Sequence, residues 1–339
     1  MTDTVLIWGA GAVGGTIGAS LARAGISVQM VDIEPEHAKI CSKIGLEVEG
    51  PVDNYRQKVP CVTPKELRGS YDRIILAVKA TATVDAVSAL KPHLNSTGFI
   101  LSAQNGLNEH YIADQLGQHR VMGCFVNFGA DWLEPGRILY GNRGAMVIGE
   151  LDGSIKSRTR DMHEVMRIFE PDAMITENIM GYLWGKMCYG SMLFATALTG
   201  ESMATNFADE TRIPILSAIA KEVLLTAAAE GVNPTGFNGF DPAAFMPNAH
   251  IGAAFDCMAK MADFNRNTAK THSGIHRDLV VRKRPTEVDH QPGIVIKIAE
   301  SHNLYTPLLK RLVSPIHDLE QNRREISPNV FYDLEQKEI

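Results

Sequence analysis

The sequence is poor in cysteine and has no two cysteines spaced as in a CxxC motif. Its five cysteines are scattered along the chain, at positions 41, 61, 124, 188 and 257. An odd and scattered set excludes a disulfide framework and lacks the ligand spacing of a zinc site. We therefore expect a protein of a reducing compartment that holds no metal.

Long apolar runs are absent as well. No window reaches the ~18 uninterrupted apolar residues that suggest a membrane-spanning helix, and residues 1–15 lack the basic segment and cleavage site of a secretion signal. We therefore expect no membrane partner and a cytoplasmic location.

An excess of basic residues is missing too: lysine and arginine total 33, aspartate and glutamate total 39, and the net charge is -6. This balance lacks the basic footprint of nucleic-acid binders, so we expect no nucleic-acid partner. The basic run Arg282–Arg284 fits a solvated helix end better than a phosphate-binding patch. A hydrophobic content of 45% excludes disorder as the main state, and 339 residues favour about two domains.

The first half of the chain alternates short apolar runs with helical segments. Strands are predicted at 4–8, 28–31, 73–78 and 99–102, and helices at 14–24 and 154–169. Continuous apolar strands between helices indicate a parallel sheet covered on both faces. Glycine-separated runs between 121 and 150 are expected to finish this sheet, followed by a strand at 173–175.

The second half is helical, with no convincing strand after residue 175. Helices are predicted at 183–198, 214–230, 242–260, 285–303 and 307–320. The predicted class is thus α/β, an N-terminal Rossmann-type doubly wound sheet followed by an all-helical C-terminal domain. We place the first domain at 1–177, the second at 178–325 and a charged, frayed tail at 326–339.

A GxGxxG motif follows the first predicted strand and opens the first helix. In a dinucleotide-binding turn, Gly9 permits the tight bend, Gly11 lets the backbone approach a pyrophosphate, and Gly14 allows close packing of helix on sheet. The free N–H groups at the helix start, around Ala12 and Val13, then face the phosphates. The other interpretation is a tight strand–helix turn without a ligand.

Polar side chains follow the next strands, where ligands of doubly wound sheets bind. Asp32 stands where a carboxylate accepts hydrogen bonds from the adenosine ribose and repels a 2′-phosphate, which favours NAD over NADP; a polar strand-end cap is the alternative. Lys79 and Asn105 end two later strands and are predicted to face the cofactor. A solvent-exposed charge and an Asn-Gly turn are the respective alternatives.

Lys186 begins the helical half among apolar neighbours. Desolvation there would lower the pKa of its ammonium group, which suits proton transfer to or from a carbonyl or alcohol oxygen. The alternative is a structural lysine whose aliphatic stem covers apolar surface while its ammonium group reaches solvent, since the same sequence spacing fits it.

Together these motifs resemble those of the ketopantoate reductase (2-dehydropantoate 2-reductase) family, in the same order across nearly the whole chain. They are the N-terminal GAGAVGG, Leu76-Ala77-Val78-Lys79, Gln104-Asn105-Gly106, Trp184-Gly185-Lys186-Met187 and Arg284-Pro285-Thr286-Glu287-Val288-Asp289. The resemblance implies a Rossmann domain and a helical domain with the active site between them. It further implies that Lys186 is the catalytic acid/base, that Glu287 holds cofactor and substrate beside it, and that Lys79 and Asn105 line the nicotinamide side.

The chain departs from the family where the substrate binds. The family's asparagines four and eight residues after the catalytic lysine are replaced by Gly190 and Phe194, unless an insertion shifts the second. The family's substrate-binding serine aligns with Gly274, next to Ser273. Arg277 is the best candidate to hold a carboxylate, because a guanidinium binds one through two hydrogen bonds. These changes predict a more apolar pocket and a substrate other than ketopantoate.

The sequence thus predicts an NAD-dependent oxidoreductase that acts on a small anionic hydroxy acid or alcohol, or its keto form. Asn105 is expected to orient the substrate oxygen as well as the nicotinamide. The alternatives are true ketopantoate reduction, an oxidoisomerase that transfers hydride transiently, and a non-catalytic NAD(P)H sensor. Alanines 227–229 and the methionine-rich stretch 258–261 fit either a core or a homodimer face.

Overall fold

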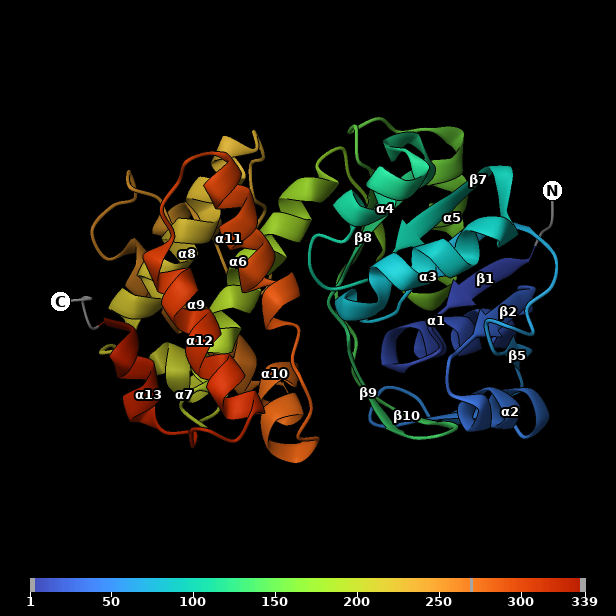
Figure 1. Cartoon of the computed structure of the whole chain (residues 1–339), viewed down its shortest axis with the longest axis horizontal. Helices are drawn as coiled ribbons and strands as arrows, with labels where there is room; N and C mark the ends of the chain where they lie inside the picture. The colour runs from blue at the N-terminus through green and yellow to red at the C-terminus, as the bar shows by residue number, and fades with distance from the viewer. Residues whose placement is uncertain (1–3, 269–270, 336–339) are drawn as a thin grey trace. The chain divides into compact units, whose positions relative to one another are not determined.

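The computed structural model describes residues 4–268 and 271–335. The chain divides into two compact units, unit 1 (Met1–Ile179) and unit 2 (Met180–Ile339). Unit 1 contains both sheets, and unit 2 is helical (Figure 1).

The main sheet of unit 1 has eight strands in the order β12-β11-β8-β7-β6-β1-β2-β5. They are β1 (Val5–Trp8), β2 (Val28–Val31), β5 (Cys61–Val62), β6 (Tyr71–Leu76), β7 (Leu94–Ser102), β8 (Val121–Val126), β11 (Met146–Glu150) and β12 (Met174–Ile175). Neighbouring strands of this sheet pair in parallel, except β11 and β8, which are antiparallel. The predicted Rossmann-type sheet is confirmed.

Helices cover both faces of this sheet. In Figure 1, α3 (Thr83–Leu90) and α4 (Glu109–Leu116) lie over the face turned to the viewer. The apolar cluster under α3 and α4 contains Leu6, whereas the neighbouring Ile7 belongs to the other cluster, with α1 (Ala12–Arg23) and α5 (Ser157–Phe169). Successive side chains of a buried strand point to opposite faces, so apolar residues occur without interruption.

A second sheet was not predicted. It has four strands in the order β4-β3-β10-β9, namely β3 (Leu46–Glu49), β4 (Tyr55–Gln57), β9 (Gly129–Glu134) and β10 (Arg137–Asn142). The expectation that residues 121–150 finish the main sheet is right for β8 and β11 and wrong for β9 and β10. The second sheet packs on α1, so closely that a Cβ on Gly15 would lie 2.5 Å from Ile138 Cδ1.

Unit 2 consists of helices joined by turns. They are α6 (Ile179–Ala197), α7 (Met203–Ala208), α8 (Ile213–Ala229), η4 (Pro242–Phe245), α9 (Ala253–Arg266), α10 (Gly274–His276), the π-helical η5 (Arg277–Val281), η6 (Val288–His290), α11 (Pro292–Ser301), α12 (Pro307–Glu320), α13 (Pro328–Tyr332) and η7 (Asp333–Glu335). The helix predicted at 242–260 is interrupted, because Gly252 adopts the left-handed conformation, with φ of +89°, directly before α9. The helix predicted at 285–303 begins only at Pro292, which occupies its first turn.

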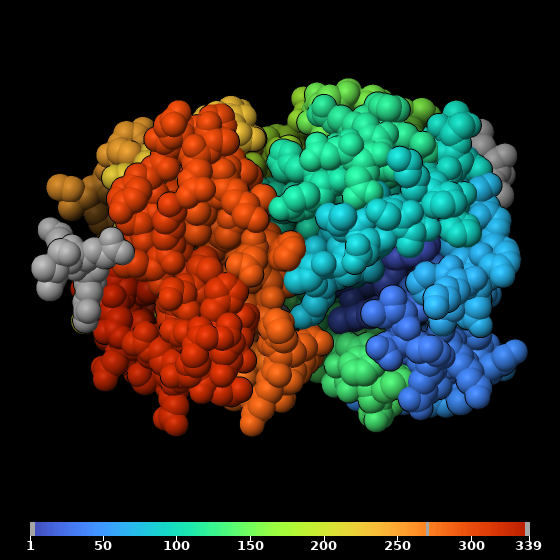
Figure 2. Space-filling model, in the orientation of Figure 1, coloured from blue at the N-terminus to red at the C-terminus, as the bar shows by residue number. Residues whose placement is uncertain are grey.

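The expected tail is instead part of unit 2 as far as the structure describes it. Residues 328–335 form α13 and η7, and Phe331 is fully buried. The Ser327 N–H donates to the Leu198 carbonyl at 3.1 Å, which fixes the start of this segment on the end of α6. In the view of Figure 2 the orange and red C-terminal residues form most of the visible surface of unit 2. Residues 336–339 of the predicted tail lie outside the described ranges.

Two ambiguous sequence features have a structural explanation. Arg282 and Arg284 both pair with Asp278, at 3.1 and 2.9 Å, so the basic run is held by a carboxylate of its own unit. Met258 and Met261 are fully buried and belong to the core. None of the helices in the described ranges combines the length and apolar character that crossing a bilayer requires.

Glu150 at the end of β11 provides a test of unit 1. Its buried carboxylate accepts hydrogen bonds from Arg158 Nε and Thr159 Oγ1 of α5, both at 2.8 Å. Burial alone raises the pKa of Glu150, but these bonds and the Arg158 charge outweigh it, so the pKa is lowered. Because the pKa of Glu150 is lower in the folded state, its carboxylate stabilises the fold at pH values above the ordinary glutamate pKa. This stabilisation is lost as the pH falls through the lowered pKa.

Glu150→Gln should therefore lower the free energy of unfolding of unit 1 by about 3 kcal/mol at neutral pH, because it leaves Arg158 without its charged partner. The difference from wild type should shrink as pH falls below about 4. Urea unfolding at several pH values measures both effects. Glu164→Gln, at an exposed position of α5, is the matched control. An equal decrease in the free energy of unfolding in this variant would contradict the role given to the Glu150–Arg158 pair.

Candidate active site

The glycine-rich turn between β1 and α1 uses each glycine differently. Gly9 has φ of +99°, and a Cβ there would lie 2.8 Å from Val78 Cγ1, at the end of β6. A Cβ on Gly14 would lie 2.0 Å from the Gly9 carbonyl oxygen. Apart from its chain neighbours, no heavy atom of the described residues lies within 4 Å of a Cβ on Gly11. Packing within the protein thus requires glycine at positions 9 and 14. At position 11 it does not, and this face of the turn is open. Ala12 and Val13 follow as the first residues of α1, both partly exposed.

The peptide unit of Ala10 is held from two sides. Its N–H donates to Asp32 Oδ2 at 2.9 Å, and its carbonyl oxygen lies 2.9 Å from His37 Nε2. The Gly136 N–H donates to His37 Nδ1 at 2.9 Å, so Nδ1 is the acceptor and Nε2 carries the proton that Ala10 accepts. The other Asp32 oxygen accepts from the Glu34 N–H at 3.0 Å. The sequence analysis identified Asp32 but missed His37, which carries no motif of its own.

Lys79 and Asn105 lie beyond the ends of neighbouring strands. Lys79 follows β6 and Asn105 follows β7, and both residues are exposed. Since β7, β6, β1 and β2 are adjacent and parallel, these residues, the glycine-rich turn and Asp32 share one edge of the sheet.

A buried amide pair connects these two strand ends. Gln104 Nε2 donates to the Val78 carbonyl at 2.9 Å and to Thr83 Oγ1 at 2.8 Å. Thr83 Oγ1 donates to Asn108 Oδ1 at 3.1 Å, and Asn108 Nδ2 donates to the Asn105 carbonyl at 2.6 Å. Gln104 is 3% exposed and Asn108 1%. The backbone on either side of the two predicted cofactor contacts is therefore fixed by one network.

In unit 2, Lys186 lies on α6 between buried neighbours. Trp184 and Met187 are buried, and Lys186 itself is partly exposed. Gly190 is one helical turn further on, on nearly the same face of α6. A Cβ on Gly190 would lie 3.2 Å from Gln291 Oε1. The Lys186 side of α6 therefore lies beside the segment that follows Glu287.

Phe194 and Ser273 have structural roles in unit 2, in the core and as a helix cap respectively. Phe194 is fully buried, so in this conformation it offers no surface to a substrate. At about 100° per residue it is rotated by about 80° from Lys186, whereas Gly190 is rotated by about 40°. Ser273 is 3% exposed, and its Oγ accepts a hydrogen bond from the His276 N–H as the N-cap of α10. Gly274 is exposed, with open space around the position of a Cβ.

Arg277 is partly exposed and begins the π-helical turn η5. Single π-helical turns occur frequently at functional sites. Arg277 was predicted from the chemistry of its guanidinium alone, and no sequence pattern predicted the π-helical turn.

A hydrogen-bonded clamp holds the backbone around Glu287. Glu320 Oε1 accepts from the backbone N–H and the hydroxyl of Thr286, at 2.7 and 2.6 Å. His317 Nδ1 lies 2.9 Å from Glu320 Oε2, and His317 Nε2 lies 3.1 Å from Asp289 Oδ1. Burial alone lowers the pKa of His317, but the hydrogen bonds to the two carboxylates outweigh it and raise the pKa. An imidazolium, which donates from both nitrogens, matches this arrangement.

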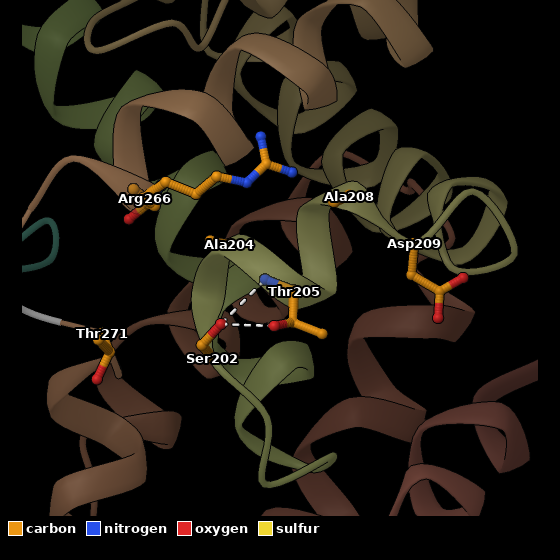
Figure 3. A pocket seen from close by; sticks show the side chains of 8 residues that line it. Ser202, Ala204, Thr205, Ala208, Asp209, Arg266 and Thr271 are labelled. Carbon is orange, nitrogen blue, oxygen red and sulfur yellow. Dashed lines mark hydrogen bonds between the residues drawn. The ribbon is translucent and has the colours of Figure 1, made fainter.

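Unit 2 also has a pocket of about 610 Å³ that contains none of the predicted site residues (Figure 3). It is lined by Ser202, Ala204, Thr205, Ala208, Asp209, Asn265, Arg266 and Thr271. Ser202 caps α7 by accepting from the Thr205 N–H, and Asp209 pairs with Arg212. Ser202 and Asp209 thus already serve the local helices.

Comparison with known proteins gives the same family along both units. The family model described as "Ketopantoate reductase PanE/ApbA" matches residues 5–153, and that of its C-terminal part matches residues 178–320. The 2-dehydropantoate 2-reductase of Pyrococcus horikoshii is 29% identical over 308 residues, which cover 90% of this chain and 93% of the relative.

Two solved structures have the same fold. A D-mandelate dehydrogenase with NADH and anilino(oxo)acetate has a TM-score of 0.82 at 19% identity, over 94% of this chain and 98% of that one. A PanE/ApbA family ketopantoate reductase from Ralstonia eutropha has a TM-score of 0.77 at 23% identity, over 95% and 100%. Because the two family models together match most of the sequence, the chain belongs to the ketopantoate reductase family.

Proposed function

We propose that the protein is an NAD-dependent oxidoreductase that interconverts a small 2-hydroxy acid and its 2-keto acid. One observation supports this proposal most: the chain has residues suited to hold the cofactor and a residue suited to transfer the proton. Unit 1 keeps an open glycine-rich turn beside Asp32, and unit 2 keeps Lys186 on a helix face beside the clamped Glu287 segment. Membership of a family of reductases supports it.

The residues of unit 1 fit a dinucleotide. The missing side chain at Gly11 leaves room for a pyrophosphate against the N–H groups of α1. Each Asp32 oxygen accepts one backbone hydrogen bond, which leaves lone pairs to accept from ribose hydroxyls. The Asp32 charge disfavours the 2′-phosphate of NADP. When bound, NAD(H) accepts or supplies the hydride at its nicotinamide ring.

The residues of unit 2 handle the proton and the substrate. Lys186 takes the hydroxyl proton during oxidation and returns it to the carbonyl oxygen during reduction. Glu287 orients the substrate hydroxyl or the Lys186 ammonium group, and Asn105 of unit 1 orients the nicotinamide. Arg277 is the candidate partner for the substrate carboxylate. The name of the structurally similar D-mandelate dehydrogenase supports a hydroxy acid as the substrate class.

Reduction of ketopantoate is the second candidate function. It is favoured by the similarity of the chain to 2-dehydropantoate 2-reductases such as the one from Pyrococcus horikoshii. The changes at Gly190 and Gly274 argue against it, because they remove side chains with which the family binds ketopantoate.

Two glycine variants separate cofactor binding from folding. Gly11→Ala should leave the melting temperature unchanged and weaken NADH binding at least tenfold, because within the described residues its methyl group meets no atom other than those of its chain neighbours. Gly14→Ala should lower the melting temperature, because its methyl group collides with the Gly9 carbonyl. NADH fluorescence titration and thermal unfolding measure the two effects. Tight NADH binding by Gly11→Ala would contradict the proposed cofactor position.

Lys186→Ala should reduce kcat at least a hundredfold while NADH binding persists, because general acid–base catalysis contributes about 10²–10⁴-fold. The nicotinamide absorbance reports turnover over a panel of 2-keto and 2-hydroxy acids that includes ketopantoate. Lys221→Ala, at an exposed position on α8, is the matched control. Near-normal turnover by Lys186→Ala would exclude Lys186 as the acid/base. Tight NADH binding without turnover by the wild type would favour a cofactor sensor instead.

Wild-type protein should have a higher kcat/KM with NADH than with NADPH, and Asp32→Asn should narrow that ratio by about tenfold or more, since removal of the charge relieves repulsion of the 2′-phosphate. Steady-state kinetics with both cofactors give the ratio. A wild type that prefers NADPH would overturn the role given to Asp32.

A further inference from the structure

We propose that Gln291 is a substrate-binding residue, whose carboxamide hydrogen-bonds a second oxygen of the substrate, beyond the carbon that reacts. This inference rests on the proposed function, because it places the substrate beside Lys186. It assigns the recognition of a hydroxyl or carbonyl oxygen on the substrate side chain to a residue outside the motifs of the sequence analysis.

The first observation is the contact between Gln291 and α6. Its Oε1 lies 3.2 Å from where a Cβ on Gly190 would be, one helical turn from Lys186. A side chain at position 190 would crowd the carboxamide, since 3.2 Å is shorter than an ordinary van der Waals contact. Glycine at 190 therefore allows Gln291 to reach the same face of α6 as Lys186.

The second observation is that the Gln291 carboxamide has no protein partner in the part of the chain that the structure describes. Gln291 is the N-cap of α11, but its side chain makes no capping hydrogen bond. Only its backbone carbonyl is engaged, by the Val295 N–H at 3.3 Å. Gln291 as a residue is partly buried, and a ligand oxygen that replaces the water at its carboxamide makes hydrogen bonds of comparable strength.

The third observation is that the backbone around Gln291 is held on both sides. Asp289, two residues earlier, is bound by His317 at 3.1 Å, and the His290 N–H donates to the Glu287 carbonyl at 3.0 Å. Pro292 follows directly and restricts the conformation of the residue before it. The side chain thus starts from a fixed backbone, and Glu287 and Gln291 belong to the same clamped segment.

The chemistry of the group defines what it recognises. A carboxamide is uncharged and offers one acceptor oxygen and two N–H donors, so it suits a hydroxyl or carbonyl group better than an apolar side chain. Such a site discriminates against a substrate without the oxygen, because the amide is then left unpaired. The recognised substrates are 2-hydroxy or 2-keto acids that carry a further oxygen on the side chain, a class to which ketopantoate also belongs, so what is new here is the residue that reads this oxygen.

Two keto acids that differ by one hydroxyl group test this directly: 4-hydroxy-2-oxobutanoate and 2-oxobutanoate. The wild type should prefer the hydroxylated acid in kcat/KM with NADH, and Gln291→Leu should reduce that preference about tenfold. Gly190→Ala should reduce it in the same direction by displacing the carboxamide. Gln118→Leu, at an exposed position of unit 1, should leave it unchanged.

Binding of the same pair is measured without turnover, as the rise in melting temperature that each keto acid causes in the presence of NAD⁺, which cannot reduce it. A hydroxyl-dependent rise that Gln291→Leu removes supports the inference even if no turnover is found, and in that case only the proposed function fails. An unchanged preference in Gln291→Leu overturns the inference while leaving the proposed function intact. Equal responses of the wild type to both acids overturn it as well.

Discussion

The arrangement of unit 1 depends on the two hydrogen bonds that hold the peptide unit of Ala10. Asp32 from the end of β2 binds its N–H, and His37 from α2 (Pro35–Lys43) binds its carbonyl oxygen. Together with the close approach of Gly9 to Val78, these contacts join β1, β2, β6 and α2 at one turn. The open side of that turn at Gly11 exists because its other sides are packed against the protein. The proposed site for a large anionic cofactor would thus rest on backbone contacts, in a chain whose net charge is -6.

The sequence predicted those features that depend on neighbours in the chain. The strands at 5–8 and 28–31 are short apolar runs, and Asp32 follows the second at the expected distance from the glycines. His37 could not be predicted, because its role depends on Gly136, 99 residues further on. The second sheet was missed for the same reason, since β10 pairs with β3 across a long stretch of sequence and no local pattern specifies that partner.

In unit 2, helices were predicted more easily than the directions of their side chains. Lys186 and Gly190 share a helix face, but Phe194 is rotated into the core, and Ser273 caps α10. The rotation of Phe194 follows from helix geometry, because each further turn of an α-helix shifts the face by some tens of degrees. The burial of Phe194 and the capping bond of Ser273 depend on the tertiary structure, which the sequence pattern does not specify. Gln291 was missed altogether, since its importance comes from the missing side chain at Gly190, about a hundred positions earlier.

The turn between β9 and β10 has an unusual task for a hairpin. Its Gly136 has φ of +80°, and a Cβ there would lie 2.2 Å from Ile40 Cγ2 of α2. The same residue donates the hydrogen bond that fixes the ring of His37. Hairpin tips usually tolerate inserted residues, since they end in solvent. Here an insertion would displace Gly136 from His37, and His37 in turn holds the Ala10 carbonyl oxygen in the glycine-rich turn. The length of the β9–β10 turn is therefore constrained by a part of the protein more than a hundred residues earlier in the sequence.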